Sequence, residues 1–134
     1  MGYIGQLPGT KALTASDIAD NLITSAKLNY SETTLTDQAT ITWDASTEDV
    51  AKVTLAGNRT LGSASSGTTG QFISLLIIQD GTGSRTLTWN AAYEFASDTA
   101  PTLTTTASKG YVFVFRYNGS KWLEVGRNQA LTLS

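Results

Sequence analysis

The chain has 134 residues, of which 15% are charged; its formal net charge is −2, and it contains no histidine and no cysteine. This length is typical of one domain with a short extension. The nine basic residues are scattered, whereas phosphate binding needs clustered Lys and Arg, so the composition argues against nucleic acid as a partner. No apolar run reaches about 18 residues and no basic segment precedes an apolar stretch, so we expect no membrane insertion and no signal peptide.

Residues 1–12 combine glycine and proline with a few apolar side chains and show no periodicity. Such a segment has no stable structure of its own. Tyr3, Ile4 and Leu7 are nevertheless apolar, which a solvated tail does not need. Two interpretations stay open here, a floppy terminus and a peptide that docks onto a partner.

A near-repeat with a period of ten residues follows, in which Thr14–Ile18 is echoed by Thr24–Leu28. In each unit a Thr or Ser can cap a short turn, and Ile18 or Leu28 supplies one apolar anchor. Helical turns this short are marginal in water and cannot bury these anchors within one chain. They need another surface, supplied either by other copies around a symmetry axis or by a larger assembly.

From about residue 36 the pattern changes to alternating apolar and polar residues, which predicts half-buried strands. Threonine, the most frequent residue of the chain, is β-branched and favours strands over helices. The predicted strands cover residues 40–44, 51–55, 72–78, 85–89, 111–117 and 120–125, and Leu131 and Leu133 are compatible with a closing edge strand. The segment 72–78 is apolar on both faces, so it lies either in the middle of the fold or at a subunit contact.

Two turns predict β-hairpins. Asp80–Gly83 would join the strand 72–78 to the strand 85–89. Asn118-Gly119 between alternating strands is a stronger indication, because both positions tolerate a positive φ.

These elements predict an all-β fold, an antiparallel β-sandwich of jelly-roll type over residues 36–134. We expect residues 1–30 to form a short extended or helical-turn N-terminal anchor and residues 31–35 to link it to the β-sandwich.

The sequence offers few residues suited to catalysis. Without His or Cys no Ser-His-Asp or Cys-His arrangement is possible, and a metal site would have to use carboxylates alone. Asp44, Glu48, Asp49, Glu94 and Asp98 could form a glycoside-hydrolysing pair, and the first three could hold calcium, although no EF-hand spacing supports this. Each lies at a strand end or in a loop, where solvated charges are common. We therefore expect no enzyme, no cofactor and no metal.

Aromatic side chains offer a different kind of site. Trp43, Trp89, Trp122 and Tyr93 could stack on sugar rings, although core packing is the commoner use of such residues. Trp122 and Trp89 are the candidates for glycan binding, and exposure of Trp122, which follows the predicted turn, would favour this use.

Four segments in a fixed order resemble a module of bacteriophage tail-fibre and other virion proteins. They are Gly70–Asn90 (GQFISLLIIQDGTGSRTLTWN), Ala100–Thr106 (APTLTTT), Tyr111–Phe115 (YVFVF) and Asn118–Trp122 (NGSKW). One departure is Gly110-Tyr111, which replaces the acid that precedes the third segment in that family. The resemblance implies no catalytic residues.

The N-terminus extends the resemblance. Met1–Gly5 (MGYIG) looks like the opening of tail fibres from marine and cyanobacterial phages, where it attaches the fibre to the virion. The resemblance implies a protein made in the host cytoplasm and assembled into the virion as a homotrimer, with other virion proteins and possible host surface glycans as partners. The expected virion-docking residues are Tyr3, Ile4, Leu7, Ile18 and Leu28. A capsid decoration protein, a lectin-like module and a polysaccharide-cleaving enzyme remain alternatives.

Overall fold

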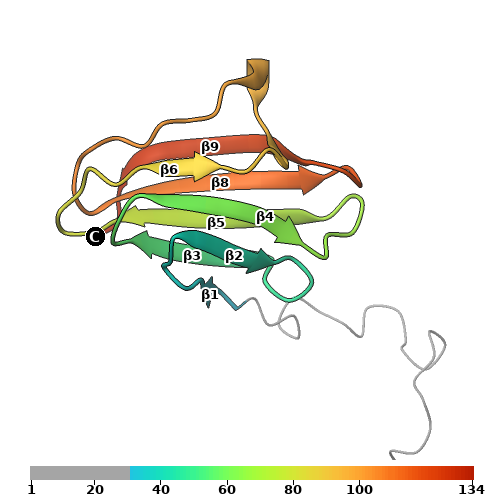
Figure 1. Ribbon diagram of the computed structural model, residues 1–134, viewed down its shortest axis with the longest axis horizontal. Helices are drawn as coiled ribbons and strands as arrows, with labels where there is room; N and C mark the ends of the chain where they lie inside the picture. The colour runs from blue at the N-terminus through green and yellow to red at the C-terminus, as the bar shows by residue number, and fades with distance from the viewer. Residues whose placement is uncertain (1–30) are drawn as a thin grey trace, which may run out of the picture. The chain divides into compact units, whose positions relative to one another are not determined.

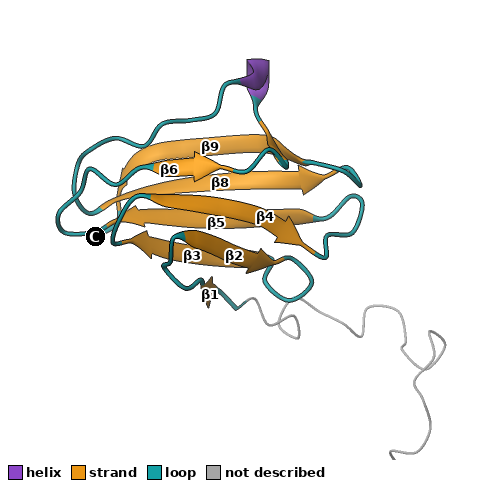
Figure 2. Ribbon diagram, viewed as in Figure 1, coloured by secondary structure: helices purple, strands orange, loops and turns teal. Residues whose placement is uncertain are grey.

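The computed structural model describes residues 31–134, and this part of the chain is built from nine β-strands (Figure 1, Figure 2). A 3₁₀ turn, Ala96–Asp98, lies between the seventh and eighth strands. None of the described residues belongs to a helix long and apolar enough to cross a membrane. The strands are β1 (Thr33–Thr34), β2 (Thr40–Asp44), β3 (Val50–Leu55), β4 (Arg59–Ser65), β5 (Phe72–Gln79), β6 (Leu87–Trp89), β7 (Tyr93–Glu94), β8 (Lys109–Tyr117) and β9 (Trp122–Thr132).

The strands form two sheets that enclose one apolar core. The larger sheet has the order β1-β3-β5-β8-β9-β7, and the smaller has the order β2-β4-β6. Figure 1 shows the smaller sheet lying across the face of the larger one. Side chains of both sheets, such as Trp43 and Leu61 from one and Leu75 and Phe113 from the other, are 2% exposed or less and belong to one cluster. The prediction of an all-β, sandwich-like fold is confirmed.

The strand pairing differs from the antiparallel, jelly-roll-like arrangement predicted from the sequence. Five of the seven strand pairings are parallel, and only β5 with β8 and β8 with β9 are antiparallel. From β1 to β6 the chain alternates between the sheets, and each strand from β3 onward pairs in parallel with the strand two before it. Two parallel neighbours must be joined by a crossover, and here a strand of the other sheet provides it.

The predicted hairpin at Asp80–Gly83 is therefore wrong, because β5 and β6 lie in different sheets. Gly83 and Ser84 have positive φ values of 74° and 59°, which turn the chain out of the plane of the larger sheet. The buried side chain of Gln79 holds this crossover together. Its amide donates to the carbonyl of Arg85 at 2.8 Å and accepts from the backbone N–H of Arg85 at 2.9 Å.

The predicted hairpin at Asn118-Gly119 is confirmed. β8 and β9 are antiparallel, and Tyr117 pairs with Trp122 across the loop. The Asn118 side chain accepts hydrogen bonds from the backbone N–H groups of Ser120 and Lys121, and Gly119 adopts a φ of 98°. The strand β9 then continues to Thr132, so Leu131 belongs to it and not to a separate edge strand.

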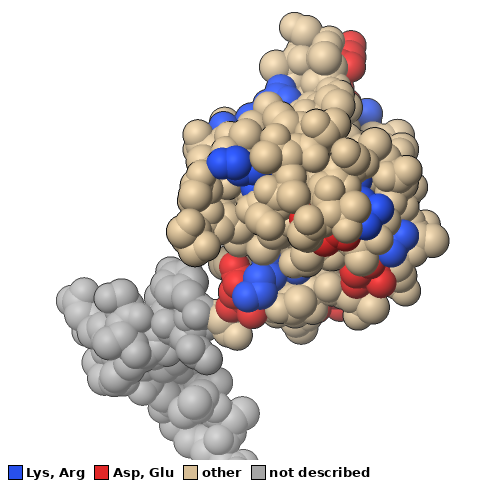
Figure 3. Space-filling model, turned by 90° about the vertical axis from the view of Figure 1, so that its left-hand side faces the viewer, with Lys and Arg blue, Asp and Glu red and all other residues tan. Residues whose placement is uncertain are grey.

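The predicted linker over residues 31–35 lies inside the β unit. Ser31–Ser134 form one compact unit in which β1 pairs with β3 and Leu35 is only 5% exposed. Leu35 follows β1 directly and belongs to the core cluster, and its backbone N–H donates to the carbonyl of Lys52 at 2.8 Å. On the face drawn in Figure 3, separate groups of Lys or Arg and of Asp or Glu lie among mostly uncharged residues.

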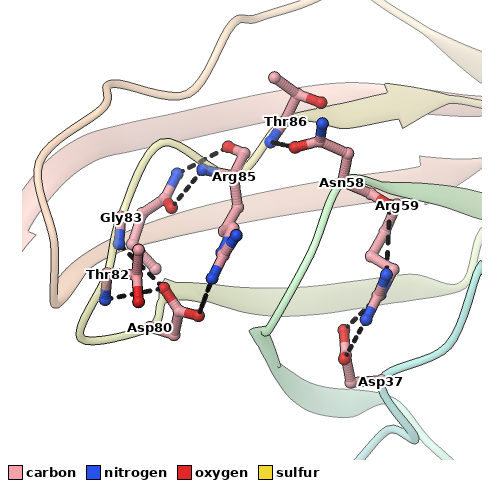
Figure 4. Close-up of polar contacts among 9 residues, drawn as sticks. Asp37, Asn58, Arg59, Asp80, Thr82, Gly83, Arg85 and Thr86 are labelled. Carbon is pink, nitrogen blue, oxygen red and sulfur yellow. Dashed lines mark hydrogen bonds and ion pairs between the residues drawn. The ribbon is translucent and has the colours of Figure 1, made fainter.

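The turns from β1 to β2, from β3 to β4 and from β5 to β6 lie at one end of the sandwich, and polar contacts link the first to the second and the second to the third (Figure 4). Arg59 donates two hydrogen bonds to the carboxylate of Asp37, at 2.9 and 2.7 Å. Asp80 accepts two bonds from the Arg85 guanidinium, at 3.0 and 2.8 Å. The Asn58 side chain accepts from the backbone N–H of Thr86 at 3.0 Å. Paired, two-bond contacts of this kind are the stronger class of ion pair.

These ion pairs predict a loss of stability in acid. The hydrogen bond from Arg59 holds the pKa of Asp37 below its usual value, and that from Arg85 does the same for Asp80. A carboxyl with a lowered folded pKa contributes stability above its unfolded pKa of about 4, and this is lost as the pH falls through the folded value. The free energy of unfolding should therefore fall below about pH 4.

Urea denaturation at a series of pH values tests this expectation on the double variant Asp37→Asn, Asp80→Asn. The variant should be less stable than the wild type at neutral pH, and its stability should decline less steeply in acid. An unchanged acid slope in the double variant would show that other carboxyls cause the decline.

Candidate functional site

A hollow of about 230 Å³ opens where the end of β6, the strand β7 and the 3₁₀ turn come together. We call it the β6–β7 pocket. The parallel pairing of Tyr93 with Trp122 places the loop between β8 and β9 at its rim, so Lys121 reaches it as well. The pocket is lined by Trp89, Asn90, Ala91, Tyr93, Glu94, Phe95, Asp98, Ala100 and Lys121.

The half-buried Trp89 forms the apolar wall of the pocket and is held from several sides. The centroid of its ring lies 4.8 Å from that of Phe113 and 5.1 Å from that of Phe95, and both contacts are edge to face. Its Nε1 donates a hydrogen bond to the carbonyl of Pro101 at 3.1 Å. An indole with its N–H satisfied and its edges packed has one orientation. The pocket therefore has a rigid aromatic wall.

Glu94 and Lys121 form the polar rim. Lys121 Nζ donates a hydrogen bond to Glu94 Oε2 at 2.7 Å. The side chain of Lys121 is 45% exposed and that of Glu94 is 34% exposed. The hydrogen bond from Lys121 lowers the pKa of Glu94, with a second contribution from Asp98. Asp98 reaches the rim because it and Ser97 both adopt positive φ values in the 3₁₀ turn. The rim thus presents charged donors and acceptors beside the aromatic wall.

Trp122, one of the two candidates for glycan binding, is not exposed. Trp122 is 0% exposed, packs against Tyr117 at 4.6 Å, and donates from Nε1 to the carbonyl of Ala64 at 3.0 Å. Its register partner Tyr117 lies on the core side of β8, and the ring of Trp122 follows it inward. Of the two candidates, Trp89 lines the β6–β7 pocket and Trp122 does not.

The predicted carboxylates divide between two places. Glu94 and Asp98 meet at the β6–β7 pocket, whereas Asp44, Glu48 and Asp49 lie around the β2–β3 turn. There Asp44 accepts from Ser46, Glu48 accepts from the backbone N–H of Asp44, and Asp49 accepts from Gln71. Within residues 31–134 no group of three acidic side chains is placed to hold a metal ion. The predicted docking residues Tyr3, Ile4, Leu7, Ile18 and Leu28 lie outside the described residues.

Lys121 and Asn90 are pocket residues that sequence reasoning did not single out. Lys121 meets Glu94 only because β7, a strand of two residues, pairs with the start of β9. Nothing in the local pattern around Tyr93 and Glu94 indicates that pairing. The alternation of Arg85, Leu87 and Trp89 with polar residues does indicate the strand that carries the aromatic wall.

Residues 29–122 match a family model described as "Putative phage tail fibre C-terminal domain". The chain belongs to this phage tail-fibre family. The tail-fibre match confirms the resemblance noted in the sequence and makes the protein a structural fibre component of a phage virion. No curated protein gives a significant match.

The tail-fibre match covers the whole β6–β7 pocket, from Trp89 to Lys121, and ends at Trp122. It thus includes both sheets except for most of β9, whose residues from Leu123 onward lie beyond it. The tail-fibre domain and the compact unit of the structure, Ser31–Ser134, start within two residues of each other.

Proposed function

We propose that this tail-fibre protein is a non-enzymatic, homotrimeric appendage of the phage particle that attaches to a sugar on the host surface. Residues 1–30 dock it onto other virion proteins through Tyr3, Ile4, Leu7, Ile18 and Leu28. The β unit that begins at Ser31 is the displayed head. The observation that carries the proposal is the β6–β7 pocket, with a fixed tryptophan wall and a charged rim.

The pocket suits one sugar ring. Its volume of about 230 Å³ is below the roughly 300–1,000 Å³ that is usual for drug-sized ligands. The apolar face of a sugar stacks on an aromatic ring such as Trp89, while its hydroxyl groups bind charged and amide side chains. Glu94, Lys121 and Asn90 supply these polar partners on the rim.

The ionised state of Glu94 suits hydrogen bonding to sugar hydroxyl groups better than the role of the acid in a glycosidase. A glycosidase needs one carboxyl group with a raised pKa, so that it stays protonated and can donate its proton to the leaving oxygen. The pKa of Glu94 is shifted in the opposite direction by Lys121. Glu94 is therefore a hydrogen-bond acceptor for hydroxyl groups and is unsuited to act as the acid.

The substitution Glu94→Gln tests the proposed site. It removes the charge that accepts from Lys121 and from a bound hydroxyl group, while the shape of the side chain is kept. The loss of one charge-assisted hydrogen bond, worth about 1.5–3 kcal/mol, should weaken binding by about 10- to 100-fold. The measurement is a glycan array of bacterial surface polysaccharides, followed by calorimetry on a saccharide that the wild type binds.

Glu32→Gln is the matched control. Glu32 also forms an exposed ion pair with a lysine, Lys52, at 2.9 Å, but on the opposite edge of the larger sheet. Exposed pairs of this kind contribute at most about 1 kcal/mol to stability, so neither variant should unfold. A wild-type protein that binds no saccharide on the array, or equal binding by both variants, would contradict the proposal.

A further inference from the structure

The lining of the β6–β7 pocket carries more acids than bases. Glu94 and Asp98 are its acidic residues, and Lys121 is its base. Lys121 already donates to Glu94 at 2.7 Å, so these two charges offset each other. Among residues 31–134 no Lys or Arg forms an ion pair with Asp98. The pocket therefore keeps one negative charge that the described part of the chain does not neutralise.

The next charged side chains along β9 leave this balance unchanged. Glu124 and Arg127 form an ion pair with each other, with Arg127 Nε 3.0 Å from Glu124 Oε1. Neither of them lines the pocket. A ligand in the pocket thus meets Asp98 as the uncompensated charge.

Asp98 is tied to the aromatic wall through the 3₁₀ turn. Its backbone N–H donates to the carbonyl of Phe95 at 3.0 Å, and the N–H of Thr99 donates to the carbonyl of Ala96 at 3.2 Å. Phe95 is 7% exposed, and its ring packs edge to face against Trp89. The turn that carries Asp98 is thus fixed beside the wall, so little ordering is needed when a ligand binds.

Two neighbouring carboxylates beside an aromatic ring favour a cation. Carboxyl groups that share a site repel each other when both are ionised, and a cation between them relieves this repulsion. Aromatic rings attract cations to their faces. A calcium ion needs about six to eight oxygen ligands, and within residues 31–134 no group of three acidic side chains is placed to hold a metal. A protonated amine, with its three N–H donors, needs fewer partners and forms charge-assisted hydrogen bonds with carboxylates.

We propose that the sugar bound in the β6–β7 pocket carries a free amino group. Its ring stacks on Trp89, and its ammonium group lies between the carboxylates of Glu94 and Asp98. An N-acetylated sugar lacks this charge, and an acidic sugar brings a carboxylate toward Asp98 and is repelled. The inference rests on the proposed function and names the class of sugar that the site takes.

A glycan array read before and after N-acetylation tests the inference. The array carries amino, N-acetylated, neutral and acidic sugars, and the full chain is applied to it. The wild type should bind sugars with free amino groups, and acetic anhydride, which converts amines into neutral amides, should abolish this binding. Binding that survives N-acetylation would overturn the inference but leave the proposed sugar site in place. A wild type that binds no sugar on the array would overturn both.

Asp98→Asn tests the charge that selects the amine. An asparagine side chain keeps the size of aspartate and tolerates the positive φ of 53° at this position, so the turn should keep its fold. Calorimetry on an amino sugar that the wild type binds should show an affinity about fivefold lower, the effect of one exposed ion pair. High salt should weaken binding by the wild type more than by the variant, since it screens the charge of Asp98.

Asp49→Asn is the matched control, because it removes the same charge from an exposed position in the turn between β2 and β3. The Asp49 carboxylate accepts from Gln71, and an amide oxygen can accept the same hydrogen bond. This variant should bind the amino sugar as the wild type does. Equal affinities of Asp98→Asn and the wild type, or equal losses in the two variants, would overturn the inference.

Discussion

Trp122→Ala is expected to lower the free energy of unfolding by about 3–5 kcal/mol, the usual cost of deleting a large buried aromatic side chain. The ring is fully buried against Tyr117, and a methyl group added at Gly67 would come within 2.6 Å of it. The surrounding backbone belongs to β4 and β9 and cannot readily close over the cavity. Urea denaturation measures the loss.

Trp122→Phe separates packing from hydrogen bonding. This variant keeps an aromatic ring but leaves the buried carbonyl of Ala64 without the indole donor that lies 3.0 Å away. An unsatisfied buried acceptor costs about 1–3 kcal/mol, so the loss should fall below that of the alanine variant. A loss for Trp122→Ala below about 1 kcal/mol would contradict the burial of this side chain.

Gln79→Leu should cost about 2–4 kcal/mol, because several buried polar groups lose their partners at once. The Gln79 side chain is 1% exposed, donates to the carbonyls of Arg85 and Thr104, and accepts from the N–H of Arg85. These contacts fix the crossover from the larger to the smaller sheet. Thermal unfolding followed by circular dichroism gives the change in stability.

Gln38→Leu is the control for this prediction. Gln38 is exposed and makes only one long contact, with Thr42 at 3.5 Å. Its replacement should change the stability by less than about 0.5 kcal/mol. Equal effects at both positions would mean that the hydrogen bonds of Gln79 do not hold the crossover.

Alternation in the sequence predicted which side chains face the core but not which strands pair. The side chains that point inward, as the period of two requires, include Leu75 and Ile77 on β5 and Phe113 and Phe115 on β8. The same period is compatible with a hairpin or with a crossover to the other sheet, since both keep one face buried. The crossover differs from a hairpin in the hydrogen bonds between the Gln79 side chain and the Arg85 backbone. Such a contact between a side chain and the backbone does not appear in the alternation of apolar and polar residues.

The candidate site was also only partly predictable. Trp89, Glu94 and Asp98 were identified as residue types suited to sugars, and the structure brings them together in one pocket. Trp122 stayed a candidate because it follows a turn, where the sequence pattern alone does not decide between core packing and exposure. The register of the hairpin decides that Trp122 is buried, since Trp122 lies opposite Tyr117 on the core side. Lys121 depended on the pairing of β7, which is too short to predict.

The alternation of strands between two sheets makes the first half of the domain modular. One coil, meaning one strand of each sheet with the turns between them, takes up 18 residues from Thr33 to its partner Ala51 and 28 from Arg59 to its partner Leu87. Each coil contacts mainly the coil before and after it. Stacks of this kind tolerate duplication or loss of a unit, because each unit depends only on its neighbours. An added coil would lengthen the stack by one strand spacing, about 4.8 Å, while the β8–β9 hairpin continued to close its end. The length of the β unit along this stack can thus change by one strand spacing at a time without rebuilding its core.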